Sequence, residues 1–107
     1  MRENMLGEKL KELREAKGLV QRQIAAELEV DTAYVSKIES NEKPVSRTHL
    51  KKLALLLGSV EEDLLTLWLA DKLYDVVKDE PAGLKSIEVV HALLKKNLKS
   101  ASKKYTK

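Results

Sequence analysis

The sequence QRQIAAELEVDTAYVSKIE, residues 21–39, contains two short helical patterns with almost no linker between them. The apolar positions of the first pattern recur at helical spacing and end at Leu28. Asp31 is a residue type that caps the start of a second helix. Only Glu29 and Val30 separate the two patterns, so the two helices must meet at a sharp angle.

The second pattern, from residue 32 to about 40, has an unusual outer face. The positions between its apolar residues are Thr32, Ala33, Ser36 and Lys37. Two short helices joined by a tight turn form a helix-turn-helix, in which the second helix projects its outer residues away from the core. Small side chains let such a helix approach a DNA groove closely, and Lys37 can reach a base edge or a phosphate. The stretch therefore indicates recognition of double-stranded DNA.

Helical patterns also fill the rest of the chain, which shows no strand-like alternation. We expect an all-α fold with helices over about residues 5–17, 20–30, 32–40, 47–57, 60–79 and 84–99. Gly18 and Gly58 are typical stop signals, and Asn41 suits a left-handed turn after the third helix.

Capping residues predict where several helices begin. Asp31 and Ser46 can cap the third and fourth helices. Ser59 and Glu62, three residues apart, predict a capping box at the start of the fifth helix. Val20 occupies the corresponding position of the second helix, although valine has no polar side chain.

The chain resembles the phage repressor and Cro (XRE) helix-turn-helix family over about residues 6–65. The matching segments are LKELREAKGL, QRQIAAELEVDTAYVSKIE and PVSRTHLKKLALLLG. The resemblance implies an all-α, five-helix repressor-like helix-turn-helix domain with a C-terminal helical extension. We therefore divide the chain into a DNA-binding domain at residues 1–58, a helical extension for dimerisation at 59–99 and a basic flexible tail at 100–107.

The resemblance also assigns roles to individual residues. It implies a structural ion pair between Arg14 and Glu39, which ties the first helix to the end of the recognition helix. It implies that Gln21 contacts the DNA backbone at the start of the second helix, where free N–H groups favour phosphate. The base-reading positions fall on Thr32, Ala33, Ser36 and Lys37.

Residues near the recognition helix are further candidates for DNA contact. Lys43 and Arg47 are expected to meet phosphates of the other strand, although such cations are also common on solvated faces. The ring of Tyr34 can pack on the neighbouring helix, or its hydroxyl can reach a phosphate. We expect the second arrangement.

Apolar side chains cover more than half of the expected fifth helix and continue on the sixth. These helices could form an intramolecular hairpin that uses all of this surface. We favour a homodimer interface, because two copies can read two half-sites about one DNA turn apart. The expected interface residues are Leu65, Trp68, Leu69, Leu73, Val77, Ile87, Val90 and Leu94.

The chain has a net charge of +3, and its charges are unevenly distributed along the sequence. The balance is +2 for residues 1–58, −5 for 59–94 and +6 for 95–107. The acidic middle repels nucleic acid, so DNA binding is expected at one end or on one face. The lysine-rich end can be a solubilising tail or a nonspecific DNA arm.

The composition and spacing of the 107-residue sequence exclude several kinds of functional site. Absence of cysteine excludes disulfides, thiolate zinc sites and a cysteine nucleophile. His49 and His91 lack partners at metal-ligand spacing, and no phosphate loop or nucleophile elbow is present. We expect no enzymatic activity, metal or cofactor. The charged N-terminus and short apolar runs predict a cytoplasmic protein without a membrane partner.

These observations predict a sequence-specific DNA-binding transcriptional regulator that acts as a homodimer on palindromic operator DNA. Its helix-turn-helix segment also resembles regulators associated with restriction–modification systems. The alternative function is an antitoxin-like protein that neutralises a protein partner through its acidic, apolar C-terminal helices.

Overall fold

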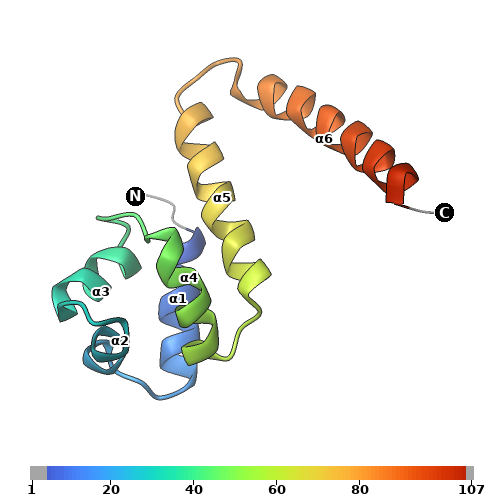
Figure 1. Cartoon of the computed structure of the whole chain (residues 1–107). Helices are drawn as coiled ribbons and strands as arrows, with labels where there is room; N and C mark the ends of the chain where they lie inside the picture. Colours follow the sequence, from blue (N-terminus) through green and yellow to red (C-terminus); the bar gives the residue numbers. More distant parts are fainter. Residues whose placement is uncertain (1–4, 106–107) are drawn as a thin grey trace. The chain divides into compact units, whose positions relative to one another are not determined.

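The computed structural model describes residues 5–105, which form six α-helices and no strand (Figure 1). The helices are α1 (Met5–Ala16), α2 (Gln21–Leu28), α3 (Thr32–Glu39), α4 (Arg47–Leu57), α5 (Glu61–Val77) and α6 (Gly83–Tyr105). The predicted all-α fold is confirmed. None of these helices is long and apolar enough to cross a membrane.

The chain folds as two compact units, divided between Lys72 and Leu73. The first unit contains α1 to α4 and the greater part of α5. The second contains the end of α5 and α6. The first unit therefore includes residues that the predicted division at residue 58 placed in the helical extension.

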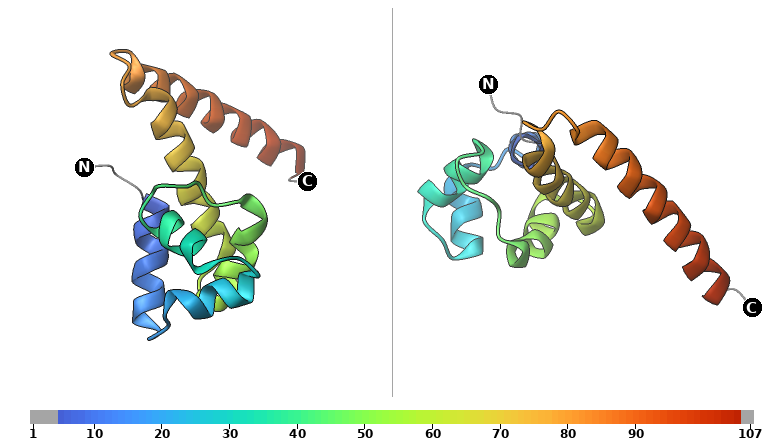
Figure 2. Two further views of the ribbon diagram at one scale, coloured as in Figure 1. Left: turned by 90° about the vertical axis from the view of Figure 1, so that its left-hand side faces the viewer. Right: turned by 90° about the horizontal axis from the view of Figure 1, so that it is seen from above.

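The core of the first unit is aliphatic and draws on all five of its helices. In Figure 2 (left), α2 runs across the lower end of α1, and α3 and α4 both pack against these two helices. Burying each large aliphatic side chain contributes about 1.5–3 kcal/mol. The core residues are Leu6, Leu10, Ile24, Ala25, Leu28, Val35, Ile38, Val45, Leu50, Leu53, Ala54, Leu57 and Leu64.

The four helices α1 to α4 end in the same way. After each one, a residue with positive φ reverses the chain, and the next N–H bonds a carbonyl five residues earlier. This is the Schellman arrangement, which satisfies carbonyls at the helix end. The residues with positive φ are Gly18 (69°), Glu29 (58°), Asn41 (68°) and Gly58 (67°). The predicted left-handed turn at Asn41 is confirmed.

The turn between α2 and α3 is built on Glu29. Its N–H bonds the carbonyl of Ala26 at 3.2 Å, and the N–H of Val30 bonds the carbonyl of Ala25 at 3.0 Å. A side chain at positive φ costs roughly 1–2 kcal/mol, because its Cβ crowds the following carbonyl oxygen. At this cost, the left-handed residue Glu29 reverses the chain within the short linker between α2 and α3.

The predicted helix caps form only in part. Asp31 and Ser46 precede α3 and α4 with extended backbones, but neither side chain caps its helix by a hydrogen bond. The capping box predicted at Ser59 is wrong, because α5 begins at Glu61 and Ser59 lies one residue too far from it. For α2, Gln23 Oε1 accepts the N–H of the preceding Val20 at 2.8 Å, which gives half of a capping box.

The start of α1 is capped by a residue 66 positions away in the sequence. Asp71 on α5 accepts the N–H of Met5 on Oδ1 at 3.1 Å and the N–H of Leu6 on Oδ2 at 3.0 Å. A carboxylate at a helix start satisfies free N–H groups and interacts favourably with the helix dipole. This contact fixes the first helix to α5 within the first unit.

In the second unit, α6 begins close to the end of α5. A Cβ at Gly83 would lie 2.6 Å from the carbonyl oxygen of Val77, so the chain requires glycine at this position. The backbone of α6 is helical to Tyr105, beyond the predicted end at residue 99. Residues 106 and 107 of the predicted tail lie outside the described residues.

We expect Asp71→Ala to lower the free energy of unfolding by about 0.5–2 kcal/mol, the usual effect of losing a helix cap. Chemical denaturation followed by circular dichroism measures this change. The matched control is Asp75→Ala, which breaks an exposed 3.4 Å pair with Lys78 and should cost less than about 0.5 kcal/mol. Equal effects of the two substitutions would contradict the capping role of Asp71.

Candidate nucleic-acid interface

Helix α3 has one buried and one exposed face. Val35 and Ile38 are each 1% exposed and face the core. The four residues predicted to read bases lie together on the opposite face, where all of them are exposed: Thr32, Ala33, Ser36 and Lys37. Three of these side chains are short and the fourth is a long cation. The face can therefore approach a groove wall closely, while Lys37 extends further.

An ion pair fixes the end of α3 to α1. Arg14 Nε donates to Glu39 Oε2 at 2.7 Å, and Arg14 Nη2 donates to Glu39 Oε1 at 3.0 Å. Each residue is only 8% exposed. Arg14 Nη1 also donates to the carbonyl of Leu19 at 2.8 Å, so the same guanidinium holds the loop that leads into α2. The pair implied by the resemblance is therefore present, with the bidentate geometry of a strong contact.

This ion pair raises the pKa of Arg14 above its ordinary value, chiefly through the hydrogen bond to Glu39 and against the effect of burial. A raised pKa means that the charged arginine stabilises the folded state at every pH below that value. The stabilisation is lost only as the pH rises through the folded-state pKa, so the contribution of Arg14 is complete at neutral pH.

Gln21 contributes to the same network rather than extending freely from α2. Its Nε2 donates to Glu39 Oε1 at 3.0 Å, and the side chain is half-buried. The amide nitrogen is therefore engaged inside the protein. At this helix start, the N–H of Gln23 bonds the carbonyl of Val20 at 3.0 Å, so only the first backbone N–H groups of α2 could meet a phosphate.

Tyr34 packs against α4, which is the arrangement that the sequence analysis did not favour. Its hydroxyl accepts the N–H of Ser46 at 3.3 Å and lies 3.0 Å from His49 Nδ1. The two rings meet edge to face, with centroids 5.4 Å apart. The hydroxyl therefore joins the recognition helix to the start of α4. His49, which had no assigned role in the sequence, is its partner.

Two cations, one in the segment between α3 and α4 and one at the first residue of α4, lie over aromatic rings. Lys43 Nζ is 5.5 Å from the centroid of the Tyr34 ring, and the Arg47 guanidinium is 5.6 Å from the centroid of the Trp68 ring. Trp68 Nε1 also donates to the carbonyl of Val45 at 2.8 Å. Tyr34 and Trp68 thus each lie under one cation, and Trp68 also holds the segment between α3 and α4.

Residues 10–65 match a family model described as helix-turn-helix, which covers more than half of the chain. The chain belongs to the XRE-type helix-turn-helix family. Members of this Cro/C1-like family are DNA-binding regulatory domains and not enzymes. No curated protein and no solved structure matches the chain.

In this XRE-type regulator, the residues predicted for the dimer interface fall into two groups. Leu65 and Trp68 pack partly buried against the core of the first unit. Trp68 also lies beneath Lys72 Nζ at 4.3 Å, in addition to its contacts with Arg47 and Val45. The remaining predicted residues are exposed or half-buried: Leu69, Leu73, Val77, Ile87, Val90 and Leu94.

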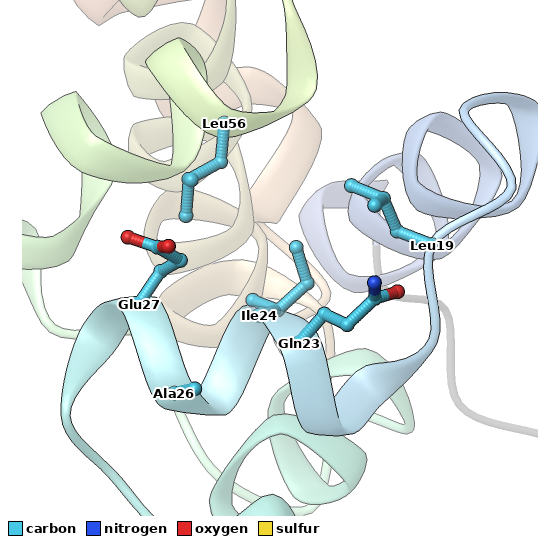
Figure 3. Close-up of a pocket in the computed structure, with 6 residues that line it drawn as sticks. All are labelled: Leu19, Gln23, Ile24, Ala26, Glu27 and Leu56. Atoms are coloured by element: carbon cyan, nitrogen blue, oxygen red, sulfur yellow. The ribbon is translucent and has the colours of Figure 1, made fainter.

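An open hollow lies beside α2. Leu19, Ile24 and Leu56 give it an apolar lining, and Glu27 adds a carboxylate at its edge (Figure 3). None of the residues that line it was predicted to contact DNA. The carboxylate makes the hollow unsuitable for phosphate, so it does not extend the interface.

We expect Arg14→Ala to lower the free energy of unfolding by about 3–5 kcal/mol, because the buried carboxylate of Glu39 loses its charged partner. Urea denaturation measures the change. The matched control is Lys9→Ala, which removes an exposed 3.4 Å pair with Glu12 and should alter stability by less than about 0.5 kcal/mol. An unchanged denaturation midpoint for Arg14→Ala would show that the pair does not stabilise α3.

Proposed function

We propose that this XRE-type regulator binds palindromic operator DNA as a homodimer and reads its sequence with the exposed face of α3. The observation that carries the proposal is the face itself: three short side chains and Lys37, all exposed on a helix whose other side is held in the core. Major-groove recognition needs a rigid helix that stands clear of its own domain. The Arg14–Glu39 pair supports that rigidity.

Affinity in this proposal comes largely from cations beside the recognition helix. Lys43 and Arg47 are both exposed, and each lies over an aromatic ring that limits its motion. A cation held in place loses less side-chain entropy when it binds a phosphate. Such contacts add affinity and salt dependence, whereas the α3 face adds sequence preference.

Dimerisation follows from the small size of the reading surface. One α3 helix presents four predicted base-reading residues, which is enough for only a short half-site. Two copies related by a two-fold axis read two half-sites about one helical turn apart, which makes the operator palindromic. Exposed apolar side chains in the second unit support self-association. The resemblance to restriction–modification regulators favours control of genes of that kind.

The antitoxin-like alternative rests on the same exposed apolar side chains in the second unit. In that case, the second unit would bind a different protein, and DNA binding would serve autoregulation. Co-purification of a small basic protein with the full chain would support this alternative. A stable homodimer of the isolated protein would oppose it.

Selection from a random duplex library with the purified full chain tests the proposal. We expect enrichment of a palindrome with half-sites about one DNA turn apart at moderate salt. Enrichment of one half-site alone would support α3 readout but oppose the dimer. Binding without any enriched motif, lost steeply as salt rises, would contradict sequence-specific recognition.

Single substitutions separate base reading from phosphate binding. Lys37→Ala should weaken binding to the selected operator by about 1–3 kcal/mol and relax the preference at one base pair. Lys43→Ala should weaken binding to all sequences alike and reduce the salt slope by about one. Titrations of operator and scrambled duplexes at several salt concentrations measure both effects. A uniform loss for Lys37→Ala would make Lys37 a phosphate contact.

A further inference from the structure

An apolar stripe runs along α6 with the spacing of a coiled-coil seam. Apolar residues at 84, 87, 94 and 98, with His91 between them, alternate in steps of three and four residues, which is the heptad pattern of core positions. Leu84, Leu94 and Leu98 are 74%, 54% and 69% exposed, so this seam is uncovered within the second unit.

One edge of the stripe carries two opposite charges. Glu88 follows the core position 84 by four residues, and Lys95 follows the core position 91 by four. Both therefore occupy the same flanking position of successive heptads and lie on the same edge of the seam. Both are exposed. His91 lies between them, three residues from Glu88 and four from Lys95.

We propose that α6 pairs antiparallel with α6 of a second copy of this chain, around a two-fold axis close to His91. Reversing one helix about that point brings Glu88 of one copy beside Lys95 of the other, twice in each pair of helices. The apolar stripes then cover one another. This inference rests on the proposed homodimer and specifies the surface and the orientation through which it forms.

The charges favour the antiparallel orientation over the parallel one. In a parallel pair, Glu88 and Lys95 face the residues five positions earlier on the other helix, Gly83 and Val90, so neither charge would gain a partner. A parallel pair would also place two lysine-rich ends side by side, because residues 95–107 carry six lysines and no acid. Antiparallel pairing separates these ends along the length of the helix.

His91 has a defined role in this arrangement. It is the one polar residue among the described core positions of the seam. A polar side chain at a core position weakens a helix pair but fixes its register, because any shift would bury it against apolar side chains. His91→Leu should therefore tighten self-association of the full chain and reduce the precision of its register.

Charge-reversal variants of the full chain test the proposal by sedimentation equilibrium. Glu88→Lys and Lys95→Glu should each weaken the homodimer by about tenfold, since each creates two like-charged contacts in place of two attractive ones. Mixing the two variants should restore dimers, because every contact in the heterodimer is again attractive. The double variant should also recover self-association.

Two matched controls carry the same changes in charge away from the seam. Glu80→Lys lies in the turn before α6, and Lys85→Glu lies on the outer face of α6, where residue 85 is exposed. Neither should change dimerisation by more than about twofold. Circular dichroism of every variant confirms that the helical content is unchanged.

The outcomes distinguish the orientation from the dimer itself. A wild-type homodimer that is weakened by both reversals and restored by mixing supports the antiparallel α6 pair. A wild-type homodimer insensitive to both reversals overturns this pair and leaves the proposed homodimer intact. A wild-type monomer at the concentrations used for DNA binding overturns both, and would favour an intramolecular hairpin or another protein on the α6 stripe.

Discussion

A guanidinium on α1 and a carboxylate on α3 share two hydrogen bonds where both side chains are almost buried. Removing these charges from water costs several kcal/mol per ion, and their attraction does little more than offset that cost. The importance of the Arg14–Glu39 pair is therefore orientation rather than net stability. It fixes the last turn of α3 against α1, while Arg14 and Gln21 extend the network to the loop before α2 and to the start of α2. The direction of the recognition face depends on this constraint.

A second set of contacts fixes the other side of α3. The Tyr34 hydroxyl bonds the start of α4, and Trp68 on α5 bonds the carbonyl of Val45 in the intervening segment. Each contact is worth only about 0.5–1.5 kcal/mol. Together they hold the segment that carries Lys43 and the start of α4, where Arg47 lies. The cations proposed for phosphate contact are thus positioned by aromatic residues, while the residues proposed to read bases are positioned by an ion pair.

Local patterns in the sequence predicted the fold well. Aliphatic periodicity located every helix, and Gly18, Asn41 and Gly58 end helices as expected, because these signals act within a few residues. Glu29 takes the same left-handed conformation without a local signal. Glutamate has no special preference for it, and the tight packing of α2 on α3 imposes it.

Contacts between distant residues could not be predicted from periodicity. Asp71 caps α1 across 66 positions, and no spacing rule relates a carboxylate on one helix to the start of another. The Arg14–Glu39 pair was predicted only through the family resemblance. Trp68 was assigned to a dimer interface because a large aromatic side chain on an apolar helix suits both an interface and a core. Its contacts with Val45 and Arg47 depend on the path of the chain after α3.

The distribution of charge explains why the proposed function needs both positioned cations and two copies. Residues 1–58 have a balance of only +2, and the following segment to residue 94 has −5. These two segments together have a balance of −3 and gain little from long-range attraction to DNA, since the acidic segment opposes it. Affinity must then come from the few cations placed at the interface, each adding one phosphate contact. Joining two such surfaces makes the second binding event intramolecular and multiplies the affinity without any new type of contact. Weak general attraction and a rigid reading face therefore favour specific sites over random DNA, provided that the two copies remain associated.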